Sequence, residues 1–438
     1  MQTEIVWPAW IIAGVLTLYL FWLMLYAGRR LRFLADTPTS KAKGVFIGQV
    51  ELAGTAKLEP PRRSFLAEVD CVWFSYTIHE EWERLVTETY TDKDGKTKTR
   101  QVLKSGWTEV GSGGEAPAFY VEDDTGAVLV QPDGAEIEAP TVFSETVTRG
   151  DALYFQKCSH SGIADSTGRR RFQEQAIPLK AELFVTGYAR ERPDVVAPEI
   201  AADSAQELYL ISCNGEARVQ RSYRKKFWFS GLAMLVGLPV ASLIQLNNTH
   251  QPITPILPVS LAAVLLIAWL TGWLWMAFNS LVHLRNRTAQ GWSLIDVQLK
   301  RRAELIPRLV EVVKGLRDHE RVVQTEVAAL RTQAVATAPG QPGPDIDSAR
   351  PLIVAIAERY PELKSSDAFL NLQRELSDTE TRIALARDYY NSIATHLNTR
   401  LEIIPDCWFA PLASLRPCPL LTVESFERAA VNVNLHTV

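Results

Sequence analysis

Three long apolar stretches divide the chain. The first runs from Trp7 to Ala27 without a charged residue, and two more, 227–246 and 255–278, follow on either side of a short polar loop. About 20 consecutive apolar residues suffice to cross a bilayer as a helix. Basic residues follow the first stretch instead of preceding it, which is typical of an anchor and not of a cleaved signal peptide. We predict a transmembrane anchor over residues 1–28 and a transmembrane helical hairpin over 227–278.

Lysine and arginine flank these stretches on one side only. The N-terminal stub and the loop at 247–254 contain neither residue, whereas the opposite flanks are rich in them. Positively charged flanks stay on the cytoplasmic side of a membrane. We therefore expect the N-terminus outside and both larger regions, 28–226 and the region after 278, in the cytoplasm. The flanking basic residues are Arg29, Arg30, Arg32, Arg221, Arg224, Lys225, Lys226, Arg285 and Arg287.

No Asp, Glu, Lys, Arg or His lies inside any of the three apolar stretches. Transporters, pumps and channels usually place ionisable groups within the membrane, because these groups carry the substrate or the coupling ion. The stretches therefore indicate anchors and packing elements, and a transporter or channel component is kept as a second alternative.

Between the anchor and the hairpin, apolar and polar residues alternate in short runs. Residues 70–79 carry Val72, Phe74, Tyr76 and Ile78 at every second position, as a half-buried strand does. The turn signals at 93–96, 124–126 and 132–134 separate further short runs, which include 100–110, 119–121, 127–130 and a closing strand at 181–187. Several short strands with frequent turns predict a small antiparallel β barrel or sandwich within residues 29–226.

From residue 279 onward, apolar residues recur at every third or fourth position with charged residues between them, which predicts helices with one buried face. A first long helix would reach residue 330, before the Pro- and Gly-rich 338–344, and a short helix would follow over 348–360. A second long helix with a narrow apolar seam completes an antiparallel long-helix bundle over 279–438. The candidate packing or assembly seam comprises Trp292, Phe369, Leu372, Leu376, Ile383, Tyr390, Ile393 and Leu397.

Composition narrows the classes of function. The chain has 46 Lys and Arg against 50 Asp and Glu, for a net charge of −4. This balance lacks the basic excess of nucleic-acid binders. Five cysteines without a CxxC pair fit neither a disulfide framework nor a zinc ribbon. We expect no cofactor and no metal site, and His283, His319 and His396 lack partners at metal-ligand spacing.

Two motifs resemble catalytic ones in part. Asp124-Thr125-Gly126 has the form of an aspartic-protease triplet, but that chemistry needs two carboxylates, and only a symmetric dimer would supply the second. The same residues suit a hairpin turn, in which Asp bonds the backbone and Gly takes a positive φ. His79-Glu-Glu-Trp-Glu83 lacks the second histidine of a zinc protease. A membrane-tethered hydrolase or ligase-like enzyme using the β segment is the first alternative to a protein that is not an enzyme.

The β segment has a series of fragments in a known order and spacing, among them Gly44–Val50, Cys71–Tyr76 and Phe119–Gly134. Through these fragments it resembles the membrane-adjacent domain of GIDE/MULAN-type proteins. In eukaryotic members this domain precedes a RING finger, which gives ubiquitin-ligase activity. A RING needs closely spaced Cys and His ligands for two zinc ions, and these 438 residues contain no such set. The resemblance is carried by Gly44–Val50, Leu58-Glu-Pro60, Cys71–Tyr76, Trp107–Val110, Phe119–Gly134, Glu174 and Ile177–Gly187.

The C-terminal region contains the fragments Gly291–Arg301, Leu305–Val310 and Phe369–Leu376 in this order. Through them it resembles the LemA family, whose members are membrane-anchored helical bundles without an attached catalytic activity. The tail around Cys407 and Cys418 departs from the usual Gly-, Phe- and Lys-rich ending. The resemblance is carried by Phe278–Leu281, Arg285–Arg287, Gly291–Arg301, Leu305–Val310, Val313–Gly315, Tyr360–Lys364, Phe369–Leu376, Glu380, Ala386-Arg387, Tyr390-Asn391, Asn398-Thr399 and Pro405.

Together these features predict a non-enzymatic α+β membrane protein that acts as a scaffold. We expect it in a bacterial inner (plasma) membrane, where it would self-assemble as a homo-oligomer or recruit partners and so organise the membrane. Its expected partners are the lipid bilayer, further copies of the chain and other membrane or cytoplasmic proteins, with no nucleic acid.

Overall fold

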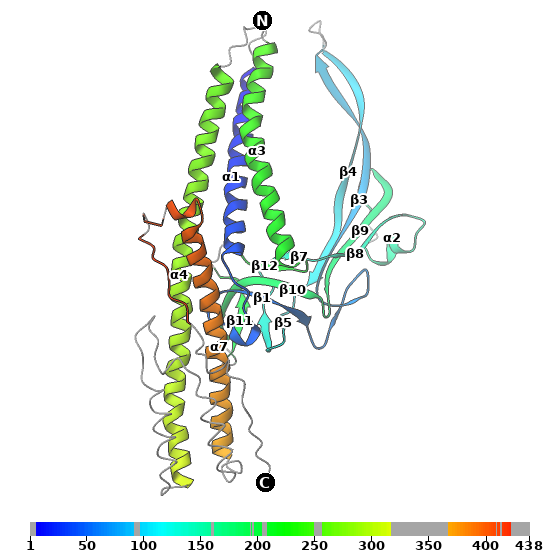
Figure 1. Cartoon of the computed structure of the whole chain (residues 1–438). Coiled ribbons are helices and arrows are strands. Elements are labelled where there is room, and N and C mark those ends of the chain that lie inside the picture. The colour runs from blue at the N-terminus through cyan, green and yellow to red at the C-terminus, as the bar shows by residue number, and fades with distance from the viewer. Residues whose placement is uncertain are drawn as a thin grey trace, which may run out of the picture. The chain divides into compact units, whose positions relative to one another are not determined.

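The computed structural model describes residues 6–91, 97–158, 162–192, 194, 197–203, 208–248, 256–316, 367–408, 410, 411 and 414–421. The chain forms two compact units. One comprises Met1–Pro38 together with Gln220–Val438, and the other comprises Thr39–Val219. We call them the helical unit and the β unit and describe each by itself (Figure 1).

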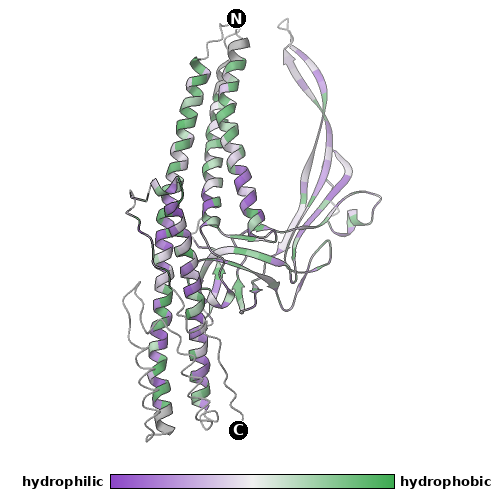
Figure 2. Cartoon of the chain, in the orientation of Figure 1, coloured by the Kyte–Doolittle hydropathy of each residue, from purple (hydrophilic) through white to green (hydrophobic). Residues whose placement is uncertain are grey.

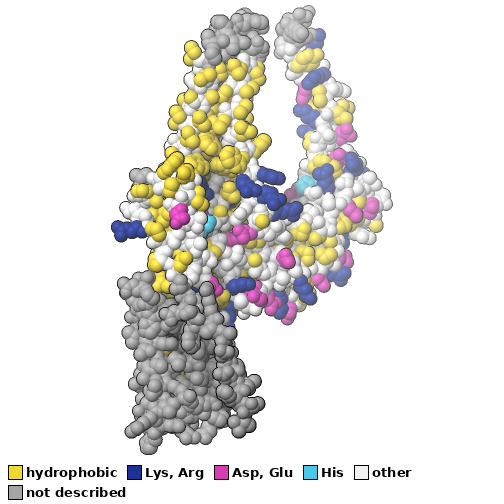
Figure 3. Space-filling model, in the orientation of Figure 1, with side chains coloured by type: hydrophobic (Ala, Val, Ile, Leu, Met, Phe, Trp, Pro, Cys, Tyr) yellow, Lys and Arg dark blue, Asp and Glu magenta, His cyan; other side chains and the backbone are white. Residues whose placement is uncertain are grey.

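The helical unit contains the three predicted membrane helices. These are α1 (Val6–Ala35), α3 (Glu216–Asn248) and the first part of α4 (Ile256–Leu316), and each is long and apolar enough to cross a membrane. Their apolar surface is uncovered, as Figures 2 and 3 show, and Leu18, Phe229 and Ile267 are each more than 60% exposed. Apolar patches of this extent are rare on proteins that face water. Lipid is therefore the medium that suits these helices, as the sequence predicted.

The three membrane helices approach one another closely at Gly28 of α1. A Cβ atom at this position would lie 2.7 Å from the Met276 sulfur on α4 and 3.1 Å from the Phe227 ring on α3. Small residues let helix backbones approach in a membrane, where the hydrophobic effect does not drive association. Gly28 thus permits the three helices to pack around one point. The loop predicted between α3 and α4 lies outside the described residues.

Beyond the apolar stretch, α4 continues as the first long helix of the bundle. It runs antiparallel to α7 (Asp367–Glu402), because the Ser280 hydroxyl contacts Arg400 while Arg302, further along α4, contacts Glu380 near the middle of α7. Trp292 and Tyr390 pack between these points in an edge-to-face arrangement, with ring centroids 5.4 Å apart. The long-helix bundle is thus present. The predicted helix end at 317–330, the 338–344 segment and the short helix at 348–360 lie outside the described residues.

The apolar seam of α7 is largely buried within the single chain. Leu372 of α7 and the seam residue Trp292 of α4 are half-buried. The buried seam residues are Phe369, Leu376, Ile383, Tyr390, Ile393 and Leu397. Contacts with α4 within the chain bury part of the seam, because Tyr390 packs against Trp292, and Ile393 and Leu397 pack with Leu284. A role of the seam in self-assembly stays a prediction.

The β unit is built around a small barrel. Strands β1 (Gly48–Lys57), β5 (Phe119–Glu122), β6 (Ala127–Val130), β11 (Pro198–Ala201) and β10 (Glu182–Glu191) pair in this order, and β1 also pairs with β10, which closes the ring. Strands β12 (Leu210–Ser212) and β7 (Glu136–Glu138) continue the sheet beyond β10. The barrel encloses fully buried side chains that include Leu52, Phe119, Val130, Val185 and Ile200.

The direction of two strand pairs differs from the antiparallel pattern. Strand β11 pairs with β6 in parallel, and β12 pairs with β7 in parallel. Alternating apolar residues show which strands are half-buried, but they do not show strand direction, because the two-residue period is the same for both. The closure of the barrel therefore required the tertiary structure.

A second sheet is formed by β2 (Arg62–Arg63), β3 (Asp70–Thr91), β9 (Ser166–Pro178) and β8 (Thr141–Thr148), with β4 (Thr97–Glu115) also pairing with β3. The short helix α2 (Leu153–Gln156) follows β8. Strand β3 is longer than the predicted 70–79 and carries two register shifts against β9. As a result Val72 joins the barrel core, whereas Phe74 and Ile78 belong to two other apolar clusters.

The hairpin between β5 and β6 has the predicted position but different turn chemistry. Phe119 pairs with Val130 as expected. The carboxylate that bonds the turn backbone belongs to Asp123, which accepts hydrogen bonds from the Thr125 and Gly126 amides at 2.7 and 3.0 Å. Asp124 instead forms an exposed ion pair with Lys41 at 2.6 Å. Gly126 does not have a positive φ, whereas Gly134 of the next turn has a φ of 79°.

Glu174 of β9 holds the loop between β2 and β3. Its fully buried carboxylate accepts hydrogen bonds from the backbone amides of Phe65, Leu66 and Ala67 at 2.7 to 2.9 Å, and from the Ser64 hydroxyl at 3.0 Å. Burying a carboxylate is costly unless such donors replace water. Glu174 is therefore a structural anion that fixes this loop on the second sheet.

Candidate functional site

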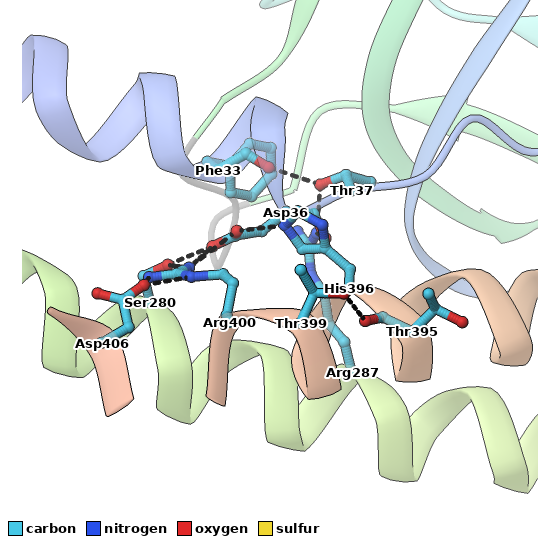
Figure 4. A network of polar contacts seen from close by, with 10 residues as sticks. All are labelled: Phe33, Asp36, Thr37, Ser280, Arg287, Thr395, His396, Thr399, Arg400 and Asp406. Atoms are coloured by element: carbon cyan, nitrogen blue, oxygen red, sulfur yellow. Dashed lines mark hydrogen bonds and ion pairs between the residues drawn. The ribbon is translucent and has the colours of Figure 1, made fainter. Parts of the chain in front are cut away.

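A cluster of charged and polar side chains lies in the helical unit, just beyond the apolar parts of α1 and α4. It begins at Asp36, the residue that follows α1 and whose amide still bonds the Arg32 carbonyl at 2.8 Å. The Asp36 side chain is only 8% exposed. Burying a carboxylate is costly unless it is paired and hydrogen-bonded. Figure 4 shows the side chains that surround it.

Three side chains from two other helices converge on the Asp36 carboxylate. Arg400 of α7 donates from Nη1 to both carboxylate oxygens, at 3.0 and 3.1 Å. The Ser280 hydroxyl, from α4, donates to Oδ2, and His396 Nε2, one turn before Arg400, lies 3.2 Å from Oδ1. The carboxylate therefore joins the end of α1 to α4 and to the last turns of α7.

Arg400 is held by a second carboxylate on its other edge. Its Nε atom donates to Asp406 Oδ2 at 2.6 Å, and its Nη1 atom also contacts the Ser280 hydroxyl at 2.5 Å. Asp406 begins the 3₁₀ turn η3 (Asp406–Trp408), just beyond α7. The planar guanidinium presents several donors in a fixed geometry and can bind two carboxylates at once. Arg400 thus also fixes the segment after α7.

A second arginine binds the same end of α1 from α4. Arg287 donates to the Thr37 hydroxyl and to the Asp36 carbonyl, the latter at 3.3 Å, and its guanidinium lies 4.8 Å from the centre of the Phe33 ring. The Thr37 hydroxyl in turn donates to the Phe33 carbonyl at 2.7 Å. The Phe33 carbonyl in the last turn of α1 is therefore capped by a side chain, and the Asp36 carbonyl just beyond α1 is bonded by a cation, which suits the negative end of a helix dipole.

The electrostatics of the cluster favour an ionised Asp36. Burial by itself raises the pKa of this carboxyl, but the hydrogen bonds with His396 and Ser280 and the positive charge of Arg400 outweigh it, so the pKa lies below its ordinary value. A buried ion pair of this kind contributes little relative to an apolar pair, yet removing one partner costs about 3–5 kcal/mol, because the other charge is left buried. The cluster therefore acts as a latch between α1, α4 and α7, and we call it the Asp36 latch.

A second buried ion pair joins the two bundle helices. Arg302 of α4 is fully buried and its Nη1 atom lies 3.1 Å from Glu380 Oε1 of α7. Because few positions on facing helices can satisfy both charges, such a pair fixes the register in which the helices pack. Together with the Asp36 latch it defines the alignment of α4 against α7 at two points.

Two asparagines of α7 bind the C-terminal tail. Asn391 accepts a hydrogen bond from the Leu421 amide at 2.9 Å and donates one to the Leu421 carbonyl at 2.8 Å. Asn398 makes the same reciprocal pair with the backbone of Cys418, both bonds at 2.8 Å. The Tyr390 hydroxyl adds a bond to the Pro419 carbonyl at 2.9 Å. Residues 418–421 of the tail thus lie along α7 as an extended segment.

The sequence did not identify the members of the Asp36 latch as a group. Ser280, Asn391 and Asn398 appeared only as parts of a family resemblance, and Arg287 only as part of that resemblance and as a basic flank. The statement that His396 lacks a partner concerned metal-ligand spacing, and its partner Asp36 is 360 residues upstream. No group of three or more metal-ligating side chains occurs among the residues that the structure describes.

The Asp36 latch attaches α7 to α1 and α4, and its geometry does not suit catalysis by Asp36. Every oxygen of the Asp36 carboxylate is engaged by a donor. A catalytic carboxylate needs a position open to substrate, and this one is enclosed by the protein. The His396 side chain, at the edge of the cluster, is 41% exposed.

Comparison with known proteins agrees with both resemblances. Residues 291–435 match the model of the LemA family, and residues 87–244 match that of GIDE, described as an E3 ubiquitin ligase. The chain is 27% identical over 161 residues to Protein LemA of Metamycoplasma hominis, which covers 36% of this chain and 74% of that protein. The chain is accordingly a fusion of a GIDE-type β region with a LemA family helical region.

Proposed function

We propose that this chain is a non-enzymatic membrane scaffold, which self-assembles or recruits partner proteins at the cytoplasmic face of a bacterial inner membrane. The observation that carries the proposal is the Asp36 latch. It fastens the bundle helix α7 to two helices that are long and apolar enough to span a bilayer. A bundle held in this way is positioned to present its surfaces at a fixed place beside the membrane.

The distribution of basic residues supports the cytoplasmic orientation. Arg29, Arg30 and Arg32 cluster at the same end of α1 as the latch, and the three cations lie over aromatic rings of neighbouring residues, at 4.3 to 5.9 Å from the ring centres. Positive charges of this kind are retained on the cytoplasmic side. In this orientation the latch and the bundle lie in the cytoplasm.

Imaging and mass measurement of the full chain in lipid nanodiscs test the scaffold. We expect assemblies of several copies, or a defined complex with a co-purifying membrane or cytoplasmic protein. A chain that remains strictly monomeric and partner-free at cellular concentrations in native membrane would contradict the proposal. Labelling of single cysteines placed at position 3 and at the exposed position 290, from each side of sealed vesicles, tests the orientation, since only position 290 should react from the cytoplasmic side.

The ligase description of GIDE supports the alternative of an enzyme that uses the β unit. Ubiquitin transfer by RING enzymes depends on zinc-bound Cys and His ligands. Incubating the full chain with ubiquitin, an activating enzyme and a panel of conjugating enzymes tests it directly. We expect no transfer above that of a chain-free control, and transfer that requires the β unit would replace the scaffold with an enzyme.

A further inference from the structure

Strands β3 and β4 continue beyond their sheet as a two-stranded ribbon. Pairing of β3 with β9 ends at Trp82, whereas β3 and β4 remain paired from Glu83 with Ser105 to Thr91 with Thr97. At about 3.3 Å per residue this ribbon extends about 30 Å. Two strands alone bury little apolar surface and are marginally stable in water. A ribbon of this length is therefore expected to have a binding partner.

The two faces of the ribbon differ sharply in charge. Residues directly opposite each other in an antiparallel pair share a face, and Arg84 pairs with Lys104, Glu88 with Arg100, and Tyr90 with Lys98. One face, which we call the basic face, therefore holds every lysine and arginine of the described ribbon. Its members are Trp82, Arg84, Val86, Glu88, Tyr90, Lys98, Arg100, Val102 and Lys104. The opposite face consists of Glu83, Leu85, Thr87, Thr89, Thr91, Thr97, Thr99, Gln101, Leu103 and Ser105.

Contacts within the basic face leave its cations in excess. Glu88 is the single carboxylate there, and it lies 3.2 Å from Arg100 and 3.0 Å from Lys104. These two partners lower the pKa of Glu88, so it stays ionised at neutral pH. Four cations against one carboxylate give this face a net charge of +3. All four cations are exposed, and Figure 3 shows Lys and Arg side chains spaced along the ribbon.

Aromatic side chains separate these cations. The Arg84 guanidinium lies 5.2 Å from the centre of the Trp82 ring, and that of Arg100 lies 5.7 Å from the centre of the Tyr90 ring. Tyr90 is 44% exposed. Trp and Tyr are the residues that favour the boundary between lipid headgroups and acyl chains, because one end of each is apolar and the other polar. Cations interleaved with them match a surface of phosphate groups over hydrocarbon.

The chain also keeps the ribbon close to a membrane. The β unit begins at Thr39, just after α1 ends at Ala35, and its last residues overlap the start of α3 at Glu216. Both of its ends are therefore tethered to helices that can span a bilayer. Such tethering raises the effective concentration of a nearby surface, and the cytoplasmic leaflet carries a negative surface potential that attracts Lys and Arg. We propose that the basic face of the β3–β4 ribbon binds the anionic phospholipid headgroups of the membrane that anchors the chain.

Labels on adjacent residues of the ribbon test this proposal. The full chain, with its five cysteines replaced, carries a fluorophore at either Val86→Cys on the basic face or Thr87→Cys on the opposite face. Each chain is placed in nanodiscs that contain a headgroup quencher, either in phosphatidylcholine alone or with phosphatidylglycerol added. We expect quenching at position 86 to rise several-fold with phosphatidylglycerol and to fall again in about 1 M salt, where charges are screened beyond about 3 Å. Quenching at position 87 is expected to change little.

Matched variants test whether lipid binding requires the cations of the basic face or any exposed cations of the β unit. In the position 86 background, replacing Arg84, Lys98, Arg100 and Lys104 by Gln is expected to reduce quenching to the level seen in phosphatidylcholine. The same number of exposed cations elsewhere in the β unit is removed by replacing Lys41, Lys57, Arg62 and Arg63 by Gln, and this control is expected to retain the response. Size-exclusion profiles that match the parent chain show that both variants are folded.

Four outcomes would overturn the proposal. Quenching that is the same in both lipids, or unchanged by the ribbon variant, excludes binding of anionic headgroups by this face. Energy transfer between labels on two chains, with no lipid dependence, identifies a second copy as the occupant. Protection of position 86 by added oligonucleotide but not by lipid identifies nucleic acid instead. None of these readouts depends on whether the chain assembles as a scaffold.

Discussion

Asp36 and Arg400 form a buried ion pair although 364 residues separate them in the sequence, with both carboxylate oxygens of Asp36 3.0 to 3.1 Å from one guanidinium nitrogen. The pair joins the residue that follows the first membrane helix to the last turn of α7. Because α4 contributes Ser280 to the same cluster, the contact connects three helices at one point. This contact attaches the bundle helix α7 to the membrane helices.

Breaking the Asp36 latch is expected to destabilise the helical unit strongly. Arg400→Gln leaves the Asp36 carboxylate buried without its cation, and we expect a loss of about 3–5 kcal/mol in the free energy of unfolding. Asp36→Asn should cost less, because Arg400 still pairs with Asp406. The double variant should cost less than the sum of the two single losses, because the Asp36–Arg400 interaction can be lost only once. Thermal unfolding in detergent of the four chains measures this coupling. Strictly additive losses would show that the two residues do not act as a pair.

The latch also predicts a specific pH dependence. Because the pKa of Asp36 is below its ordinary value of 3.8, the ionised carboxylate stabilises the folded state fully above that value, and this stabilisation is lost as the pH falls through the folded pKa. The difference in stability between the parent chain and Asp36→Asn should therefore shrink as the pH falls below about 4. A difference that grows towards low pH would contradict the assignment.

Arg302 and Glu380 are expected to be replaceable together but not singly. Arg302→Met leaves Glu380 buried without its cation and should cost about 3–5 kcal/mol, whereas Arg302→Met with Glu380→Leu should approach the stability of the parent chain. Chemical denaturation of the full chain in detergent, followed by circular dichroism, gives these values. Equal losses in the single and double variants would mean that the pair is not the source of the effect.

The tail segment is expected to depend on the two asparagines that bind its backbone. Asn391→Ala and Asn398→Ala each remove two hydrogen bonds, so the backbone of residues 418–421 should exchange its amide protons faster and be cut more readily by protease. Hydrogen exchange followed by mass spectrometry measures this. Asn371→Ala, on an exposed position of the same helix, is the matched control and should leave the tail protected.

Glu174 is expected to hold its loop by charge as well as by shape. Glu174→Gln keeps the size of the side chain but turns an NH₂ group towards backbone donors, and hydrogen bonds to a charged acceptor are worth about 1.5–3 kcal/mol each. We expect faster exchange at the amides of residues 65–67 and a lower melting temperature of the β unit. The exposed Glu182→Gln serves as the control, and unchanged exchange at 65–67 in Glu174→Gln would show that the loop is held in another way.

The sequence by itself determined which parts of this chain are helical, which are strand-rich and which can lie in a membrane. These properties follow from local patterns: about 20 uncharged residues in a row, a two-residue alternation, or a recurrence at every third or fourth position. The long helices α4 and α7, the hairpin at 119–130 and the three membrane helices were all predictable on this ground. The full length of β3 was not, because its polar outer half is a strand only through its pairing with β4.

The tertiary structure alone decided which distant residues meet. Asp36 is one carboxylate after a basic segment, and His396 is one histidine on a long helix. No local sequence pattern around either residue indicates that the two are in contact, because the contact arises when α7 folds back along α4. The closure of the barrel by β1 and β10, and the docking of the tail on Asn391 and Asn398, depend in the same way on packing between segments far apart in the chain. A periodic pattern specifies an element and its buried face, whereas pairing between elements is a property of the folded chain as a whole.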